Sequence, residues 1–291
     1  MSTLLEPAAA FTSPGKPALG ALALAGEAGR AAIARGHLEP GDVDLLIYAG
    51  LYDDEALGEP AVAALLQRDL GINPLPVAAG TGTFSFDVSN GGCGVLSALE
   101  IAHGFLASGA AEHVLVVASD AAPGHGIALD FPFAPVGAAV ACRWSEGDLG
   151  IAAFHWEKAP EEGELLYSRL AWDGHHNRLH VEQDREFDSR AAVWASKAVH
   201  SLLAEQRLTD DDVDLVIANP LRAGFREGLF VGTGIDPGKI LEVPDGEAIH
   251  SAALLVALAR AEQQGRLRDA RRVLLVSAGA GLTVGAALLL R

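Results

Sequence analysis

The sequence contains few cysteines and no basic leader. Two cysteines, Cys93 and Cys142, cannot form a disulfide framework or a four-thiolate zinc site. This cysteine usage fits a reducing compartment, so we expect a cytosolic, cytoplasmic protein. The stretch 18–26 is apolar, but no basic leader precedes it and Glu6 stands where a signal peptide would carry positive charge. We therefore expect no secretion signal.

Basic residues are scarce as well. The chain has 21 lysines and arginines against 38 aspartates and glutamates, which gives a formal net charge of −17 at pH 7. A surface of that charge repels nucleic acid, so we expect no nucleic-acid partner. With 50% hydrophobic and 20% charged residues the composition is that of a globular protein, and 291 residues suit one large domain or two fused halves.

Only one uncharged run, residues 273–290, is long enough to suggest a membrane span. Gly279, Gly281 and Gly285 interrupt it, together with hydroxyl residues. We interpret the run as two buried strands around a glycine turn and predict no membrane segment.

The chain contains an internal duplication. The sequence VDLLI at 43–47 recurs as VDLVI at 213–217, in each case after an acidic turn. Two further pairs of segments match in the same order: VLVVAS with VLLVSA at 114–119 and 273–278, and VGAAV with VGAAL at 136–140 and 284–288. Each half is therefore predicted to run as helix, buried strand, loop, strand, helix, strand, glycine turn, strand.

These patterns predict an α/β fold. Continuous runs of valine, isoleucine and leucine are typical of strands buried on both faces, and their alternation with helices implies parallel or mixed sheets covered by helices. We expect an N-terminal half over 1–150, connecting loops over 151–190 and a C-terminal half over 191–291. The segment 156–188 is charged, rich in tryptophan and histidine, and without a clear period. We expect it to bridge the halves with loops that lie over one face.

The densest chemical signal surrounds Cys93. Residues 86–99 have the sequence FDVSNGGCGVLSAL, in which a short strand runs into small residues and then a helix. Cys93 is thus predicted at a helix N-terminus, where the unpaired N–H groups would lower the pKa of its thiol from about 8.5 toward roughly 3.5–7.5. The flanking glycines would leave the Cys93 amide free to donate to an oxyanion. The alternative is a small buried residue that only fills space.

The chain resembles the thiolase-like condensing enzymes, most closely β-ketoacyl-ACP synthase III and its relatives. The matching elements cover most of residues 21–291: the turn around Cys93, the strands at 43–48, 114–120 and 213–219, and the ending GAGLTVGAAL at 279–288. The resemblance implies a duplicated fold layered α-β-α-β-α, with two mixed sheets of about five strands each. It also implies that the cysteine accepts an acyl group from a thioester.

The partners and cofactors implied by the resemblance follow from that chemistry. The thioester would be an acyl-CoA or the phosphopantetheine of an acyl carrier protein, used as a substrate. We expect no tightly bound cofactor and no metal. The resemblance further implies a homodimer, or a heterodimer with a second thiolase-like chain.

Two polar residues of the second half would complete the site. In synthase III one of them is the histidine of a His-Gln-Ala-Asn motif; here the sequence reads ANPLR, so Asn219 stands in its place. Thiolases carry an asparagine there, and Asn219 would donate to a thioester carbonyl or a water. The other precedes the last long helix, where DGEAIHSAA supplies His250. The resemblance implies a trio of Cys93, Asn219 and His250, with His250 as the base and the backbone N–H groups of Cys93 and Ala280 as oxyanion donors.

Other interpretations of these two residues remain open. His250 could be a helix-start histidine bound to backbone, and Asn219 could be a strand-end cap. The family usually opens with a strand, and residues 1–20 predict none. The sequence FAPVG at 133–137 replaces the GDGAG of relatives, and the segment 73–85 is long. We therefore expect remodelled substrate access rather than a standard acyl-carrier or coenzyme A tunnel.

A histidine cluster is the second candidate constellation. His176 and His180 are four residues apart and would share a helix face suited to a metal, with His175 beside them. Arg178 and the surrounding charges favour a solvated loop instead. Cys142 lies within a predicted strand and is interpreted as a packing residue.

The arginines of the second half are the third candidate. Arg222 and Arg226, with the basic run at 266–272, would dock an acidic carrier protein or a nucleotide phosphate. The alternative is that such runs form a solvated helix end.

The sequence thus predicts an acyltransferase or condensing enzyme that forms an acyl-Cys93 intermediate. Two alternatives stay open. The Asn219 replacement and the missing opening strand would suit a non-catalytic partner subunit of a heteromeric condensing enzyme. A thioester hydrolase, in which His250 activates water, is the other.

Overall fold

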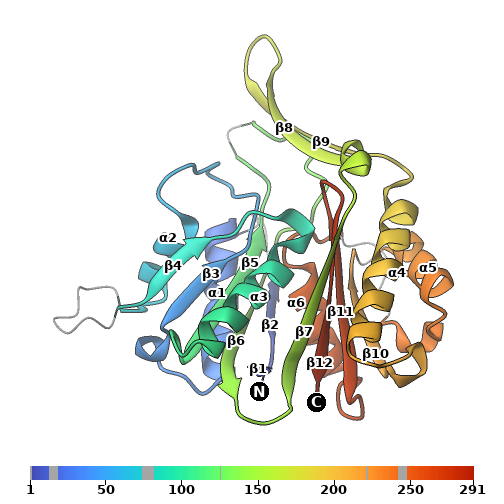
Figure 1. Ribbon diagram of the computed structural model, residues 1–291. Helices are drawn as coiled ribbons and strands as arrows, with labels where there is room; N and C mark the ends of the chain where they lie inside the picture. Colours follow the sequence, from blue (N-terminus) through green and yellow to red (C-terminus); the bar gives the residue numbers. More distant parts are fainter. Residues whose placement is uncertain (1, 13–18, 74–81, 125, 221, 242–247) are drawn as a thin grey trace.

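The structure is a computed structural model that describes residues 2–12, 19–73, 82–124, 126–220, 222–241 and 248–291 (Figure 1). Its helices are α1 (Ala21–Arg35), α2 (Val62–Asp69), α3 (Gly94–Ala107), α4 (Phe187–Glu205), α5 (Ala223–Thr233) and α6 (Ala253–Gln263). Its strands are β1 (Ser2–Leu5), β2 (Ala9–Thr12), β3 (Leu45–Tyr48), β4 (Phe84–Asp87), β5 (His113–Asp120), β6 (Val136–Ser145), β7 (Gly150–Lys158), β8 (Leu166–Trp172), β9 (Asn177–Gln183), β10 (Leu215–Asn219), β11 (Arg272–Gly279) and β12 (Thr283–Leu290). The α/β class is confirmed.

Each half contributes a mixed sheet. In the N-terminal half β3 lies between β4 and β5, parallel to both, and β6 runs antiparallel to β5 and β2. In the C-terminal half β10 is parallel to β11, β12 is antiparallel to β11, and β7 is antiparallel to β12. The run 273–290 is therefore two buried strands, as predicted, and no helix among the described residues is long and apolar enough to cross a membrane.

The sequence led us to expect two separate sheets, but in the structure they are joined. β1 pairs antiparallel with β6 on one side and, through Thr3 and Ile151, with β7 on the other. Hydrogen bonding therefore joins both halves into one sheet of 10 strands. The prediction that residues 1–20 lack a strand was wrong. Ser2 and Thr3 are polar, so no apolar pattern marks β1, yet both residues are buried at this junction.

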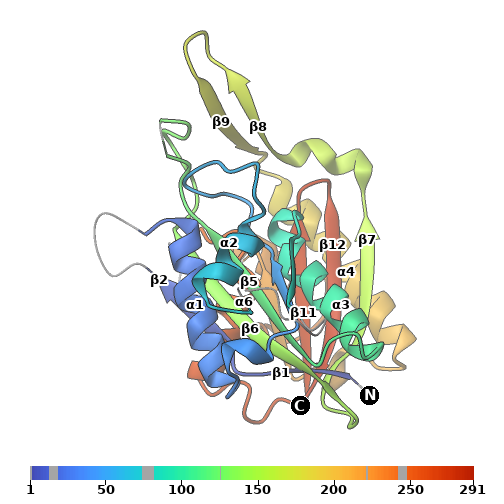
Figure 2. The same cartoon turned by 90° about the vertical axis from the view of Figure 1, so that its left-hand side faces the viewer.

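The helices complete five layers. α3 and α6 lie between the two sets of strands, where Leu99 and Leu255 share one apolar cluster with strand residues of both halves. α1 and α2 cover the outer face of the N-terminal strands, as Figure 2 shows, and α4 and α5 cover the outer face of the C-terminal strands. On β3, Leu45 points to the central cluster and Leu46 to the outer one. Burial on both faces explains the continuous apolar runs.

The duplication extends to individual hydrogen bonds. The Asp44 carboxylate accepts the backbone N–H groups of Glu112 and His113 at 2.8 and 3.0 Å, just where β5 begins. The corresponding Asp214 accepts the N–H groups of Arg271 and Arg272, both at 2.8 Å, where β11 begins. Among the described residues the second half has no full counterpart of β4, since that side of β10 carries a single bridge between Val216 and Ile240.

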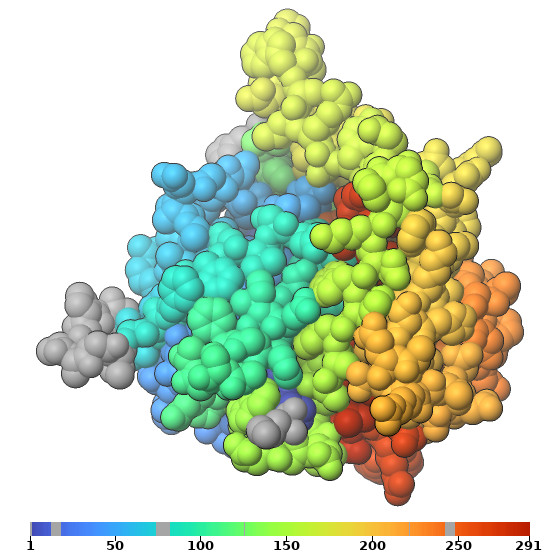
Figure 3. Space-filling view, in the orientation of Figure 1, coloured from blue at the N-terminus to red at the C-terminus, as the bar shows by residue number. Residues whose placement is uncertain are grey.

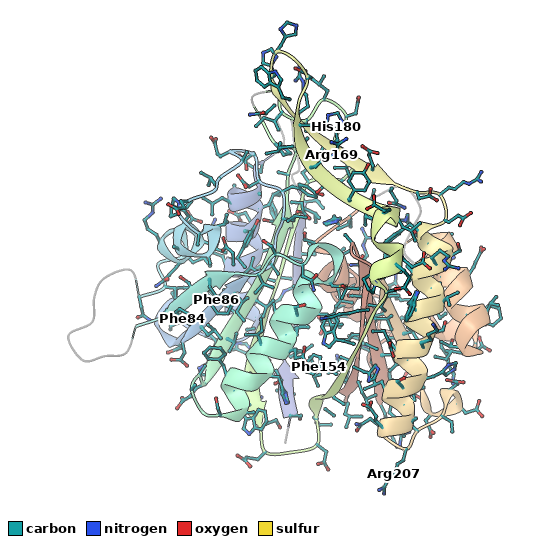
Figure 4. All side chains as sticks on the ribbon, turned by 45° about the horizontal axis from the view of Figure 1, so that its top comes forward. Phe84, Phe86, Phe154, Arg169, His180 and Arg207 are labelled. Carbon is teal, nitrogen blue, oxygen red and sulfur yellow. The ribbon has the colours of Figure 1, made fainter. Side chains whose placement is uncertain are left out.

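The segment between the halves is more regular than predicted. β7 extends to Lys158, and β8 and β9 form an antiparallel hairpin instead of loops. The hairpin projects beyond the body of the molecule (Figures 1 and 3). Its register pairs Arg169 with His180, and Figure 4 shows both side chains on this projection.

Candidate active site

Cys93 lies at a strand-to-helix turn, as predicted. β4 ends at Asp87, a 3₁₀ turn covers Gly91–Cys93, and α3 begins at Gly94. Gly91 has a φ of 46°, which favours glycine. Gly92 admits no side chain, because a Cβ there would lie 2.7 Å from the carbonyl oxygen of Ala278. The first half therefore delivers its cysteine directly against the end of β11.

The environment of Cys93 corrects two predictions. Its side chain is fully buried, and burial raises the pKa of the thiol to about 12, opposite to the lowering expected from the helix N-terminus. The Sγ donates to the carbonyl oxygen of Thr283 at 3.3 Å. The Cys93 amide is not free, because it donates to the carbonyl of Asn90 at 2.9 Å within the 3₁₀ turn. Desolvation outweighs the helix dipole here, because the dipole effect is small beside the cost of burying a thiolate.

Asn219 reaches the same turn from the second half. It is the last residue of β10 and is buried. Its Nδ2 donates to the carbonyl oxygen of Gly92 at 2.6 Å. The amide therefore contacts the residue that precedes Cys93.

His250 approaches from the segment before α6. A Cβ at Gly91 would lie 3.3 Å from its Cε1 and 3.6 Å from its Nε2, so the ring rests on the nucleophile turn. Phe133 and Tyr52 flank the ring, at centroid distances of 4.4 and 5.3 Å. Burial lowers the pKa of His250, the nearby Asp120 opposes that effect, and Arg222 adds to it. Burial therefore favours the neutral form of the imidazole.

Asp120 is a buried polar residue that the sequence analysis assigned no role. It ends β5, and its carboxylate lies 3.8 Å from the Nδ1 of His250. It accepts hydrogen bonds from the backbone of Leu51 and Tyr52 and from Ser251. The available signal was a carboxylate at the carboxyl end of β5, a strand parallel to β3 in the same sheet as the β4 strand that leads to Cys93.

The glycine turn between β11 and β12 closes the site. A Cβ at Gly279 would lie 3.4 Å from the Cys93 Sγ, and Ala280 follows it. A pocket of ≈ 20 Å³, room for about one water molecule, adjoins this turn. Its lining includes Gly92, Asn219, His250 and Gly279. A second pocket of ≈ 240 Å³ adjoins it and is lined by His250, Ala280 and Tyr52, among others.

Arg222 lines the small pocket too, but it is already engaged. Its Nε donates to both carboxylate oxygens of Asp188 at 2.9 Å, and its Nη2 donates to one of them at 2.6 Å. Arg226 lies one helical turn further along α5. The basic run at 266–272 does not join them, because Arg272 begins β11 whereas Arg222 follows the opposite end of the parallel strand β10. A single dock containing both groups is therefore wrong.

The histidine cluster does not share a helix. His175 and His176 lie at the hairpin tip, where their backbone N–H groups bond to Asp173, and His180 lies on β9. No group of residues suited to hold a metal ion occurs in the part of the chain that the structure describes. Cys142 is buried in β6, as its interpretation as a packing residue requires.

Comparison with solved structures shows which fold the chain has. The fold superposes on the 3-oxoacyl-(acyl carrier protein) synthase III of Pseudomonas aeruginosa PAO1 with a TM-score of 0.84, at 19% identity, covering 100% of this chain and 98% of the other. The synthase III of Aquifex aeolicus VF5 gives 0.84 at 21% identity, with both chains fully covered. A Xanthomonas campestris OleA variant with bound lauric acid and lauroyl-CoA gives 0.83 at 16% identity, covering 100% and 99%. The fold is that of the thiolase-like condensing enzymes.

Sequence comparison identifies the family within that class. Residues 86–157 match the model of 3-oxoacyl-[acyl-carrier-protein] synthase III, and residues 203–290 match its C-terminal model. The chain is 30% identical to the β-ketoacyl-[acyl-carrier-protein] synthase III of Nitratidesulfovibrio vulgaris strain DP4 over 91% of its own length and 83% of that protein. The Rhodospirillum rubrum synthase is 29% identical, with 91% and 82% covered. The chain belongs to the β-ketoacyl-ACP synthase III family and is a condensing enzyme.

Proposed function

We propose that this enzyme carries its acyl group on Cys93. The observation that supports the proposal is convergence on one turn: Asn219 bonds to Gly92, His250 rests on Gly91, and Gly279 abuts the Cys93 sulfur. Asn219 and His250 come from the second half of the chain, and Cys93 comes from the first. General packing does not require three polar or reactive side chains at one buried turn.

The acylation step begins from a neutral thiol. Because burial raises the pKa of Cys93 to about 12, the sulfur must lose its proton as it attacks. His250 is the base: its Nε2 takes the proton, the sulfur bonds to the thioester carbonyl carbon, and the carbon–sulfur bond to the donor breaks. The donor leaves as a thiolate and takes up the proton from His250. Such proton transfer is typically worth about 10²–10⁴ in rate.

Asn219 and the glycine turn would donate hydrogen bonds to oxygen atoms of the substrate. The Asn219 amide donates to a bound water, for which the small pocket beside it has room, or to a thioester carbonyl oxygen that takes the place of that water. The backbone N–H of Ala280 is the proposed oxyanion donor. The Cys93 N–H would serve as the other after releasing the Asn90 carbonyl, to which it is bonded.

The proposed donors are acyl-CoA and acyl carrier protein thioesters. The relatives are named for an acyl carrier protein, and the OleA structure holds lauroyl-CoA. Arg222 supports a phosphate contact, since the bonds to Asp188 use its Nε and Nη2 and, within the described part of the chain, leave its Nη1 to face an anion. Arg226, one turn away, would add to that contact.

We also propose that the enzyme is a homodimer joined at β4. β4 ends the order of strands and pairs only with β3 among the described strands. Phe84 on this strand is 57% exposed and contacts Phe86 and Phe105, at centroid distances of 5.2 and 6.4 Å. An apolar edge strand is suited to pair with a copy of itself.

Product analysis tests the proposed function. The purified enzyme is given acetyl-CoA or lauroyl-CoA together with malonyl-carrier protein, and products are separated by mass. We expect a β-ketoacyl product that Cys93→Ala does not form, with His250→Ala slowed about 10²–10⁴-fold. Free acid as the sole product, at a rate that depends on His250, would show hydrolysis instead. No product from the enzyme alone, with product on adding a second thiolase-like chain, would support the partner subunit.

A further inference from the structure

The carboxylate of Asp120 is fully buried next to the base. Its Oδ1 accepts the N–H groups of Leu51 and Tyr52 at 3.2 and 3.0 Å, and its Oδ2 accepts the N–H of Ser251 at 2.7 Å. These three bonds tie the segment after β3 and the segment before α6 to the end of β5. A buried carboxylate with this many donors is held in one orientation.

The hydroxyl of Ser251 connects this carboxylate to the imidazole. Ser251 Oγ donates to Asp120 Oδ1 at 3.1 Å and lies 3.2 Å from the Nδ1 of His250. A hydroxyl has one proton, and a carboxylate only accepts. The Ser251 proton therefore goes to Asp120, and the Ser251 oxygen accepts from His250. This requires the proton of the neutral imidazole to be on Nδ1.

We propose that Asp120 and Ser251 are positioning residues that hold His250 as its Nδ1–H tautomer, so that Nε2 is left as the proton acceptor at the nucleophile turn. The ring geometry agrees, because Nε2 lies 3.6 Å from the position that a Cβ at Gly91 would occupy. The inference rests on the proposed function of His250 as the base. Neither residue touches the reacting atoms, and both act through His250.

The charged and titratable groups around His250 set the direction of any pH effect. Asp120 faces it from β5, Arg222 from the start of α5 and Tyr52 from the segment after β3, and the Cys93 turn adjoins it. Asp120 raises the pKa of His250, while burial and Arg222 lower it. Asp120→Asn removes the raising effect and should move the acid limb of the rate profile to lower pH.

The tautomer is measured directly by nitrogen-15 NMR on the whole protein labelled at histidine. We expect the His250 signals of the unmodified enzyme at neutral pH to show a protonated Nδ1 and an unprotonated Nε2. Ser251→Ala should change this to a mixture with substantial Nε2–H, since it removes the acceptor at Nδ1 while leaving Asp120 its backbone partners. His250→Gln assigns the signals. A wild-type His250 protonated mainly on Nε2, or a spectrum that Ser251→Ala leaves unchanged, overturns the inference.

Kinetics provide the second readout. Ser251→Ala should lower kcat/KM for Cys93 acylation about 10–100-fold, the range found when the hydrogen-bond partner on the second ring nitrogen of a metal-bound histidine is removed. Ser119→Ala is the matched control, because Ser119 is equally buried on β5 but its hydroxyl bonds to the Ala21 carbonyl and Tyr48. We expect less than about a threefold change for it, and equal losses in both variants would contradict the relay. The NMR result does not depend on turnover, so failure of the proposed function and failure of the relay are distinguishable.

Discussion

At the scale of single residues, Cys93 and Asp120 each owe their surroundings to residues of the other half of the chain. The spacing of glycines around Cys93 correctly placed it before a helix. The direction of its pKa was wrong, because the burial of the thiol depends on Gly279 and Thr283, which lie far away in the sequence. Asp120 was missed for the same reason, since its partner Ser251 belongs to the other half.

The raised pKa of Cys93 has a consequence for stability. Below about pH 8.5, the ordinary pKa of a thiol, Cys93 is neutral in both folded and unfolded chains. Between pH 9 and about 12 only the unfolded chain releases the proton, so the free energy of unfolding falls as the pH rises. Urea unfolding between about pH 9.5 and 11 should show Cys93→Ala with a slope shallower by up to about 1.4 kcal/mol per pH unit. Equal slopes for both proteins would refute the buried, protonated thiol.

Asn219 should support the fold of the site as well as its chemistry. Asn219→Ala leaves the buried Gly92 carbonyl without its donor, so we expect a loss of about 1–3 kcal/mol in the free energy of unfolding. Asn73→Gly is the control, since that amide donates to the Gly41 carbonyl in an exposed position and to the Thr83 hydroxyl, and glycine tolerates the φ of 38° there. Chemical denaturation measures both. A loss for Asn219→Ala no larger than that for Asn73→Gly would argue against a buried bond.

At the scale of elements, the duplication could be recognised in the sequence because each half repeats its buried strands in the same order. The strands at 43–47 and 213–217 became β3 and β10, and even their preceding 3₁₀ turns share a capping box. β1 was not predicted, because its burial arises from pairing with β6 and β7 and its own sequence shows little apolar pattern. The hairpin of β8 and β9 was missed because it is solvated and shows no alternation.

The exposed edge of β4 gives a prediction at this scale. Phe84→Glu places a charge at the proposed dimer contact, so light scattering should show a monomer at micromolar concentrations where the parent chain is a dimer. Leu129→Glu, at an apolar side chain that is 73% exposed elsewhere, should leave the dimer intact. A parent chain that is itself monomeric, or dissociation by both substitutions, would refute the β4 contact.

At the scale of the whole molecule, the site forms where turns and strand ends of the two halves contact each other. Asn219 at the end of β10 bonds to Gly92, and His250 before α6 lies against Gly91. The turn after β11 packs against Cys93. That arrangement follows from stacking two copies of one unit around α3 and α6, which brings Cys93, Asn219 and His250 to the same turn. The size of the pockets could not, because their walls come from the segments around Tyr52 and Phe133 and from the hairpin.

The most direct test is intact-protein mass spectrometry after incubation with acetyl-CoA and, separately, lauroyl-CoA. We predict a mass increase of one acyl group, assigned to Cys93 by peptide fragmentation, and none in Cys93→Ala. Cys142→Ala, the matched buried cysteine in β6, should be acylated like the parent chain. An unmodified parent chain with either thioester, or an acyl group located on another residue, would contradict the account.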